Sequence, residues 1–226
     1  MTLDDLEKAL EAILLEHDDG TDGSHDIHHA RRVLLNAKEI AKRESGTADQ
    51  RHLTAAAYLH DLVNVSKGSA QRSQASRLSA EAAGPILEQL EFNSDEIAAI
   101  QHSITAHSFS ANIPPETLEA KILQDADRME SVGALGIART FYTAGKLSSL
   151  LFDGDDPFAE GRDLDDKRFA VDHFKAKLLG LSATMQTAAG KVMTQERSEF
   201  MHRYLEQLAH EIGSDLRGQR RDARSL

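Results

Sequence analysis

The stretch LTAAAYLHDLV (residues 53–63) places a histidine and an aspartate, His60 and Asp61, side by side in an apolar segment. Burying two polar groups without partners is unfavourable, and a bound metal ion would remove that penalty. On a helix the two side chains point about 100° apart, so one ion could bind both only above the seam between them. Taken alone, the dipeptide is more often a helix end that binds no ligand.

Helical periodicity continues through nearly all of the chain, so the sequence predicts an all-α fold. No run alternates apolar and polar residues in a way that demands a sheet, and there is no internal repeat. The expected helices cover about residues 1–16, 26–43, 49–63, 71–90, 165–181 and 182–213, with a Gly- and Pro-bearing acidic loop at 151–164. Two more are expected between residues 93 and 151, one containing Ile97, Ile100 and Ile104 and one starting at Pro114-Pro115 and holding Asp125 and Asp127.

Several boundaries follow from capping and breaking signals. Either Ser24 or Asp26 can cap the helix at 26–43. Asn93 or Ser94 can cap the fifth expected helix, which contains Ile97. Proline inside a helix removes one backbone donor, so we expect the helix at 71–90 to be strained or broken at Gly84-Pro85. The helix that starts after Pro114-Pro115 is expected to break near Gly133 or Gly136.

The composition excludes several classes of function. The chain has 226 residues, a net charge of −11 and no cysteine, which argues against nucleic acid as the main partner and excludes disulfides and thiolate catalysis. The first 16 residues are acidic and amphipathic, unlike a signal peptide, and no apolar run is long enough to span a membrane. We therefore expect a cytoplasmic protein that has no membrane partner.

Histidines and aspartates recur upstream and downstream of the His60-Asp61 pair. Upstream, His29 shares a helical face with Asp26 and Val33, and only one or two of the three close histidines can face a common point. Downstream, Asp125 and Asp127 differ by about 200° around a helix, so at most one of them points at a given centre, and periodicity alone does not choose between them. Mixed imidazole and carboxylate ligands suit a borderline divalent ion.

The order of these motifs resembles the HD-domain metal-dependent phosphohydrolase superfamily. The resemblance covers about residues 20–210 and extends to one bacterial subfamily, whose members have been linked to nucleotide pyrophosphohydrolase activity. The matching motifs are HDxxHxxRV (residues 25–33), HD (60–61), HSIxxHSFS (102–110), QDADR (124–128), GAxGIAR (133–139), FDG (152–154), DHFxxKL (172–178) and TxxGK (187–191).

The resemblance implies an HD-domain helical bundle with additional C-terminal helices. It is expected to form a single domain over residues 1–215, with the metal core at about 20–140 and the C-terminal helices at about 163–213. Residues 216–226 are expected to be a frayed basic tail. The implied metal ligands are His29, His60, Asp61 and Asp127, and they would hold one divalent ion. Manganese is expected first, with Mg, Co, Ni, Fe and Zn as alternatives.

The implied reaction is hydrolysis of a phosphoric ester or anhydride by a metal-activated water. Asp61 would also orient this water, and Lys67, Arg72 or a histidine would offset charge on the transferring phosphoryl group. A solvated surface is an equally compatible role for Lys67 and Arg72. The subfamily resemblance points to a nucleotide substrate, cleaved by a pyrophosphohydrolase or phosphodiesterase reaction. Two alternatives stay open, which are a dinuclear iron oxygenase on the same fold and a non-catalytic nucleotide sensor.

Four further side chains are candidates for contact with substrate or with a second metal ion. His102 and His107 could hold a second ion, contact substrate or serve a structural role, and they are the feature that would permit the oxygenase. Ser76 lies at a junction of loop and helix, where a phosphate could sit, although a solvated surface is equally compatible. Lys177 is a weaker phosphate candidate. The sequence makes no prediction of oligomeric state.

Overall fold

The computed structural model describes residues 1–17, 26–45, 47–63 and 72–214, and the predicted tail at 216–226 lies outside these ranges. Helices account for the regular structure of the described residues, which form no strand, and the all-α prediction is confirmed. The described ranges contain one isolated backbone bridge, between Leu150 and Phe169.

The chain divides into two compact units. Unit 1 comprises residues 1–127 and 186–190, and unit 2 comprises 128–185 and 191–226. A single domain over residues 1–215 stays a prediction.

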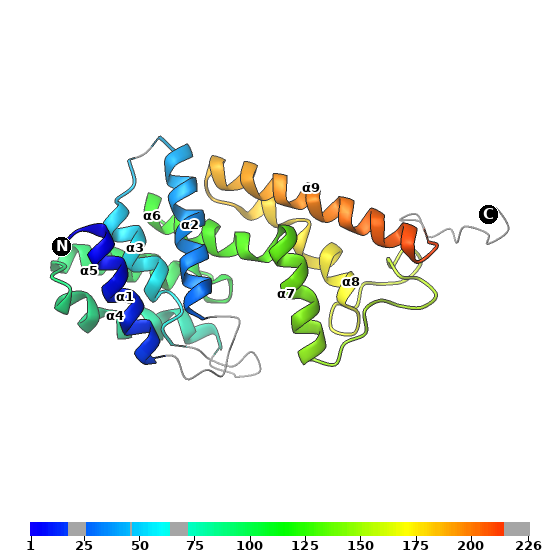
Figure 1. Cartoon of the computed structure of the whole chain (residues 1–226), viewed down its shortest axis with the longest axis horizontal. Helices are drawn as coiled ribbons and strands as arrows, with labels where there is room; N and C mark the ends of the chain where they lie inside the picture. The colour runs from blue at the N-terminus through cyan, green and yellow to red at the C-terminus, as the bar shows by residue number, and fades with distance from the viewer. Residues whose placement is uncertain (18–25, 46, 64–71, 215–226) are drawn as a thin grey trace. The chain divides into compact units, whose positions relative to one another are not determined.

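Unit 1 is a helical bundle built around α3 (Gln50–Leu59), which packs against α1, α2 and α5 (Figure 1). Every residue from His52 to His60 is buried, as the apolar sequence of this segment predicts. The other elements of the unit are α1 (Leu3–His17), α2 (Ile27–Arg43), η1 (Arg72–Gln74), α4 (Ala75–Gln89), α5 (Ser94–His107), η2 (Phe109–Ala111) and α6 (Leu118–Arg128).

The helix starts of unit 1 follow the predicted capping signals. The Asp26 carboxylate caps α2 by accepting the His29 N–H at 2.9 Å, and His25 and Ser24 lie outside the described residues. Asn93 and Glu96 form a reciprocal capping box at the start of α5. The first of these caps fixes the turn of α2 that carries His29.

Two local expectations were wrong. Helix α3 ends at Leu59 instead of continuing to residue 63, so His60 and Asp61 lie in the turn that follows it. His60 keeps helical backbone angles there, with φ −63° and ψ −33°, and Asp61 Oδ2 lies 3.4 Å from the His60 Nε2. Helix α4 continues through Gly84-Pro85, and the Gln101 side chain of α5 donates to the Ala80 carbonyl in the preceding turn at 2.8 Å.

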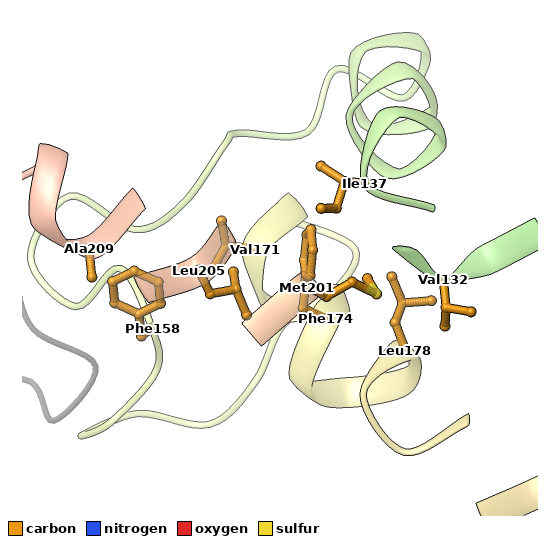
Figure 2. Close-up of a cluster of buried hydrophobic side chains, with 9 residues drawn as sticks. All are labelled: Val132, Ile137, Phe158, Val171, Phe174, Leu178, Met201, Leu205 and Ala209. Carbon is orange, nitrogen blue, oxygen red and sulfur yellow. The ribbon is translucent and has the colours of Figure 1, made fainter. Parts of the chain in front are cut away.

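Unit 2 has a hydrophobic core of its own, in which side chains from α7, η4 and α9 face one another (Figure 2). Its elements are η3 (Met129–Ser131), α7 (Gly133–Lys146), α8 (Ala170–His173), the π-helical turn η4 (Phe174–Leu178), η5 (Leu181–Thr184) and α9 (Ala188–Glu211). The core residues are Val132, Ile137, Phe158, Val171, Phe174, Leu178, Met201, Leu205 and Ala209.

The predicted break near Gly133 is confirmed. Gly133 has φ +74°, and the Arg197 side chain lies 3.2 Å from the position that a Cβ atom would occupy, so both the conformation and the space favour glycine. The predicted helix at 165–181 begins later, at Ala170, because the backbone of 168–171 pairs with residues 150 and 151. The predicted helix at 182–213 likewise begins only at Ala188.

Candidate metal centre

Five side chains of unit 1 converge at the ends of four helices. His29 lies in the first turn of α2, His60 and Asp61 follow α3, His107 is the last residue of α5, and Asp127 lies near the end of α6. Within the described ranges, two groups bring nitrogen and oxygen donors within 4.8 Å of one another, namely His29, His60 and Asp127, and His60, Asp61 and His107.

The donor atoms lie at close and similar distances. The Nε2 atoms of His29 and His60 are 3.2 Å apart. Asp127 Oδ1 lies 3.5 Å from the His29 Nε2 and 3.9 Å from the His60 Nε2. Asp61 Oδ2 lies 3.4 Å from the His60 Nε2 and 3.8 Å from the His29 Nε2. Adjacent ligands on one ion, each bound at about 2.1 Å, would be roughly 3.0–3.5 Å apart, so the donor pairs within each group of three lie near the spacing that one divalent cation requires.

Backbone carbonyls fix the orientation of two imidazoles. His60 Nδ1 lies 2.9 Å from the Ala57 carbonyl oxygen, and His107 Nδ1 lies 2.6 Å from that of Ile104. A carbonyl oxygen only accepts, so each Nδ1 carries a hydrogen and each ring turns its Nε2 towards the cluster. This arrangement is usual for histidines that bind metal ions.

The cluster shifts the pKa values of its members in opposite directions. Burial acts to raise the pKa of the Asp61 carboxyl, but His60 and His107 outweigh it and hold the pKa well below its usual value. Burial likewise opposes the effect of His29 and His60 on Asp127, whose pKa is also lowered. Burial acts to lower the pKa of His107, yet contact with Asp61 raises it. Both carboxylates are therefore ionised and available to bind a cation.

The structure separates the roles of the two aspartates of α6. Asp125 is fully buried, and its carboxylate accepts the Gln186 N–H, the Thr187 N–H and the Thr187 hydroxyl at 2.7–2.8 Å. Gly190 lies against it, and a Cβ atom there would overlap the Asp125 carboxylate. Asp125 thus holds the segment at 186–190, and Asp127 is the aspartate that faces the histidines.

The remaining candidates lie in different surroundings. His102 Nε2 accepts the Glu116 N–H at 3.1 Å, while His107 Nε2 lies 3.6 Å from Asp61 Oδ1, so only His107 joins the cluster. Lys177 belongs to unit 2, where it pairs with Asp166 at 2.6 Å. Ser76 is buried in the first turn of α4. Lys67 lies outside the described residues, and only the backbone of Arg72 lies within them.

Two buried amides that support the site were not among the predicted site residues. Asn36 of α2 donates to the Ala126 carbonyl at 3.2 Å, and Gln124 donates to the Ala106 carbonyl at 2.7 Å. Ala126 precedes Asp127 and Ala106 precedes His107, so each hydrogen bond holds the backbone next to a cluster residue. The sequence could have indicated Asn36, because it follows His29 by seven residues and therefore lies on the same face of the helix.

The comparisons with known proteins agree with this geometry. The HD domain family model matches residues 26–131. The protein YpgQ of Bacillus subtilis (strain 168) is 32% identical over 213 residues, which cover 90% of this chain and 90% of YpgQ. The chain therefore belongs to the HD-domain family, and the resemblance read from its motifs is confirmed.

Solved structures extend the comparison to the fold of almost the whole chain. The crystal structure of Bacillus subtilis YpgQ in complex with ADP has a TM-score of 0.69 at 31% identity, covering 92% of this chain and 93% of that one. A HD-superfamily hydrolase from Bacillus thuringiensis has a TM-score of 0.69 at 28% identity, covering 92% and 96%. The fold is therefore that of the HD-superfamily hydrolases. No helix in the described ranges is both long and apolar enough to cross a membrane.

Proposed function

We propose that the chain is a metal-dependent phosphohydrolase that cleaves a phosphoric ester or anhydride bond of a nucleotide. The observation that carries the proposal is the convergence of the His29, His60, Asp61 and Asp127 donor atoms at 3.2–3.9 Å. The YpgQ complex with ADP supports a nucleotide as the ligand, because that protein is 31% identical over most of both chains.

These four side chains would hold one divalent ion, and manganese is the first choice among Mn, Mg, Co, Ni, Fe and Zn. A bound ion of this kind lowers the pKa of a coordinated water towards neutrality and polarises a phosphoryl oxygen. Asp61 can serve two partners, since its Oδ2 faces His29 and His60 while its Oδ1 lies 3.6 Å from His107. The carboxylate can therefore also orient the attacking water.

His107 supplies a proton donor beside the reacting group. Its Nδ1 is held by the Ile104 carbonyl, so a second proton must reside on Nε2, the atom that faces Asp61. From there it can pass to a phosphoryl or leaving-group oxygen. Lys67, Arg72 and Lys177 remain predicted phosphate contacts.

A substrate screen tests the proposal. Nucleoside mono-, di- and triphosphates and cyclic nucleotides are incubated with Mn, Mg, Co or Ni, and products are identified by mass. We expect release of phosphate or pyrophosphate from a nucleotide in the presence of metal and none in its absence. Nucleotide binding without any product would contradict the proposal and favour the sensor.

The oxygenase alternative needs a second ion, for which His102 and His107 were the candidate ligands. His102 Nε2 accepts the Glu116 N–H, and among the described residues His102 belongs to neither group of close donor atoms, which argues against a second ion held by this pair. We expect His102→Ala and His107→Ala each to retain about one metal ion per chain by elemental analysis. His107→Ala should also lower kcat/KM about tenfold or more, through loss of proton donation. Two ions in the wild type, falling to one in either variant, would favour the oxygenase.

A further inference from the structure

The first turn of α4 carries a buried hydroxyl group without a partner. Ser76 is 2% exposed, and among the described residues its Oγ has no hydrogen-bond partner. A buried hydroxyl usually finds a partner, because leaving one unsatisfied is unfavourable. The Ser76 hydroxyl is therefore available as a hydrogen-bond donor or acceptor to a ligand at this position.

The same turn presents backbone donors. The first N–H groups of a helix have no i−4 partner within it, and the 3-10 turn η1 before α4 engages only the earliest of them. Gln74, the N-cap of α4, makes no side-chain capping bond. The first turn contains no acidic residue. Backbone N–H groups, a hydroxyl and the positive end of the helix dipole together favour an anion with several oxygen atoms.

Two contacts place this turn beside the metal cluster. Ser79, one turn further along the same face of α4 as Ser76, accepts the Val63 N–H at 3.0 Å, and Val63 is two residues beyond Asp61. The turn η1, which leads into α4, packs against η2, which begins two residues beyond His107. Two residues of chain span at most about 7.6 Å between Cα atoms. Val63 therefore lies within about this distance of Asp61, and Phe109, the first residue of η2, within about this distance of His107.

We propose that the first turn of α4, with the Ser76 hydroxyl, binds a phosphate group of the substrate other than the one attacked. This inference rests on the proposed function and specifies its substrate class as nucleoside di- or triphosphates. The metal cluster would hold the reacting phosphoryl group, and the α4 turn would hold its neighbour along the polyphosphate chain.

The test compares Ser76→Ala with Thr194→Val. Thr194, in the α9 part of unit 2, is the matched control, because it too is fully buried and its hydroxyl has no partner among the described residues. Removing either hydroxyl should leave the melting temperature unchanged or higher, since an unsatisfied group is lost. Only Ser76→Ala should raise the KM for a nucleoside triphosphate, by about tenfold or more. Ser76→Cys, which keeps the volume with a weaker donor, should behave like Ser76→Ala.

A second readout does not need turnover. Inorganic pyrophosphate, added with a chelator to metal-free protein, should raise the melting temperature of the wild type and of Thr194→Val, but not that of Ser76→Ala. If the wild type hydrolyses nucleotides and Ser76→Ala keeps its KM and its response to pyrophosphate, the inference is wrong and the proposed function stands. If the wild type hydrolyses no phosphate compound, the proposed function fails. In that case the melting temperatures decide the inference alone. A rise with pyrophosphate in the wild type that is lost in Ser76→Ala supports a phosphate site at the α4 turn, and no rise in the wild type shows that the site does not exist.

Discussion

Each unit contains carboxylates that contact cationic or imidazole side chains, but the partners and the burial of these carboxylates differ. In unit 2 the Asp172 carboxylate is fully buried and forms two bonds to the Arg162 guanidinium, at 2.5 and 2.8 Å, and a third to the Asp165 N–H at 2.7 Å. In unit 1, Asp61 and Asp127 are 28% and 29% exposed and face imidazoles at 3.4–3.9 Å.

The difference lies in the kind of charge that each partner supplies. An arginine is always cationic and forms a bidentate pair, so the Asp172 pair is balanced by protein groups alone. A histidine is neutral near pH 7 unless its surroundings raise its pKa. The neutral imidazole offers a nitrogen lone pair rather than a positive charge. The unit 2 pair therefore stabilises the fold, whereas the unit 1 cluster suits a divalent cation.

The largest expected effect is that of Asp61→Asn. The substitution removes a negative charge from the ligand set and the group that would orient the water. We expect loss of the bound metal ion and a decrease in kcat of about a thousandfold or more, with the helical circular dichroism signal retained. One equivalent of metal and normal turnover in the variant would show that Asp61 is not a metal ligand and would contradict the account of the unit 1 cluster.

The next largest effect separates Asp127 from Asp125. Asp127→Asn should weaken metal affinity by about a hundredfold or more, because it neutralises a proposed ligand. Asp125→Asn should change metal affinity far less but lower the free energy of unfolding by about 2 kcal/mol, because the amide cannot accept all three hydrogen bonds. Titration with metal and urea denaturation measure the two effects. The opposite ranking of metal affinities would make Asp125 the ligand.

The unit 2 side of the comparison predicts a loss of stability without a loss of metal. Asp172→Asn leaves the Arg162 charge without its partner and should lower the free energy of unfolding by about 3 kcal/mol. Asp163→Asn, on the exposed surface nearby, is the matched control and should have little effect. Metal stoichiometry should stay at the wild-type value in both variants, and a decrease in Asp172→Asn would contradict the distinction between the units.

The smallest effect concerns a surface pair within unit 1. Glu11 of α1 accepts hydrogen bonds from Arg31 and Tyr58, and chiefly the Arg31 contact lowers the pKa of Glu11 to about 2. A lowered pKa stabilises the fold above the ordinary value of 4.5, and this stability is lost as the pH falls from about 4.5 through 2.

Glu11→Gln should therefore lower the free energy of unfolding at pH 7, and the difference from the wild type should diminish towards pH 2. Because solvent screens an exposed pair, we expect no more than about 1 kcal/mol. Urea denaturation at pH 7 and pH 3 measures it, with the exposed Glu16→Gln of the same helix as control. An equal difference at both pH values would show that the charge of Glu11 is not its cause.

The parts of the fold that local chemistry controls could be predicted from the sequence. The Asn93–Glu96 capping box and the break at Gly133 each depend on a few adjacent residues, and both are present. The end of α3 at Leu59 and the late start of α8 could not be predicted, because they depend on contacts between segments. The pairing of residues 150–151 with 168–171 is one such contact.

The same division applies to the site. The resemblance alone selected Asp127, since periodicity left Asp125 and Asp127 equivalent. The reason for the difference is a set of hydrogen bonds between Asp125 and residues 186 and 187, far along the chain, which no local pattern shows. The separation of His107 from His102 likewise depends on the backbone of Glu116.

The central claim is that one divalent ion binds between α2, α3, α5 and α6. Anomalous diffraction from crystals grown with manganese tests it directly, because the signal locates the ion without reference to activity. We predict one strong peak within about 2.3 Å of the Nε2 atoms of His29 and His60 and of an oxygen from each of Asp61 and Asp127. A peak at Asp125, or no peak between the two histidines at saturating manganese, would contradict the account.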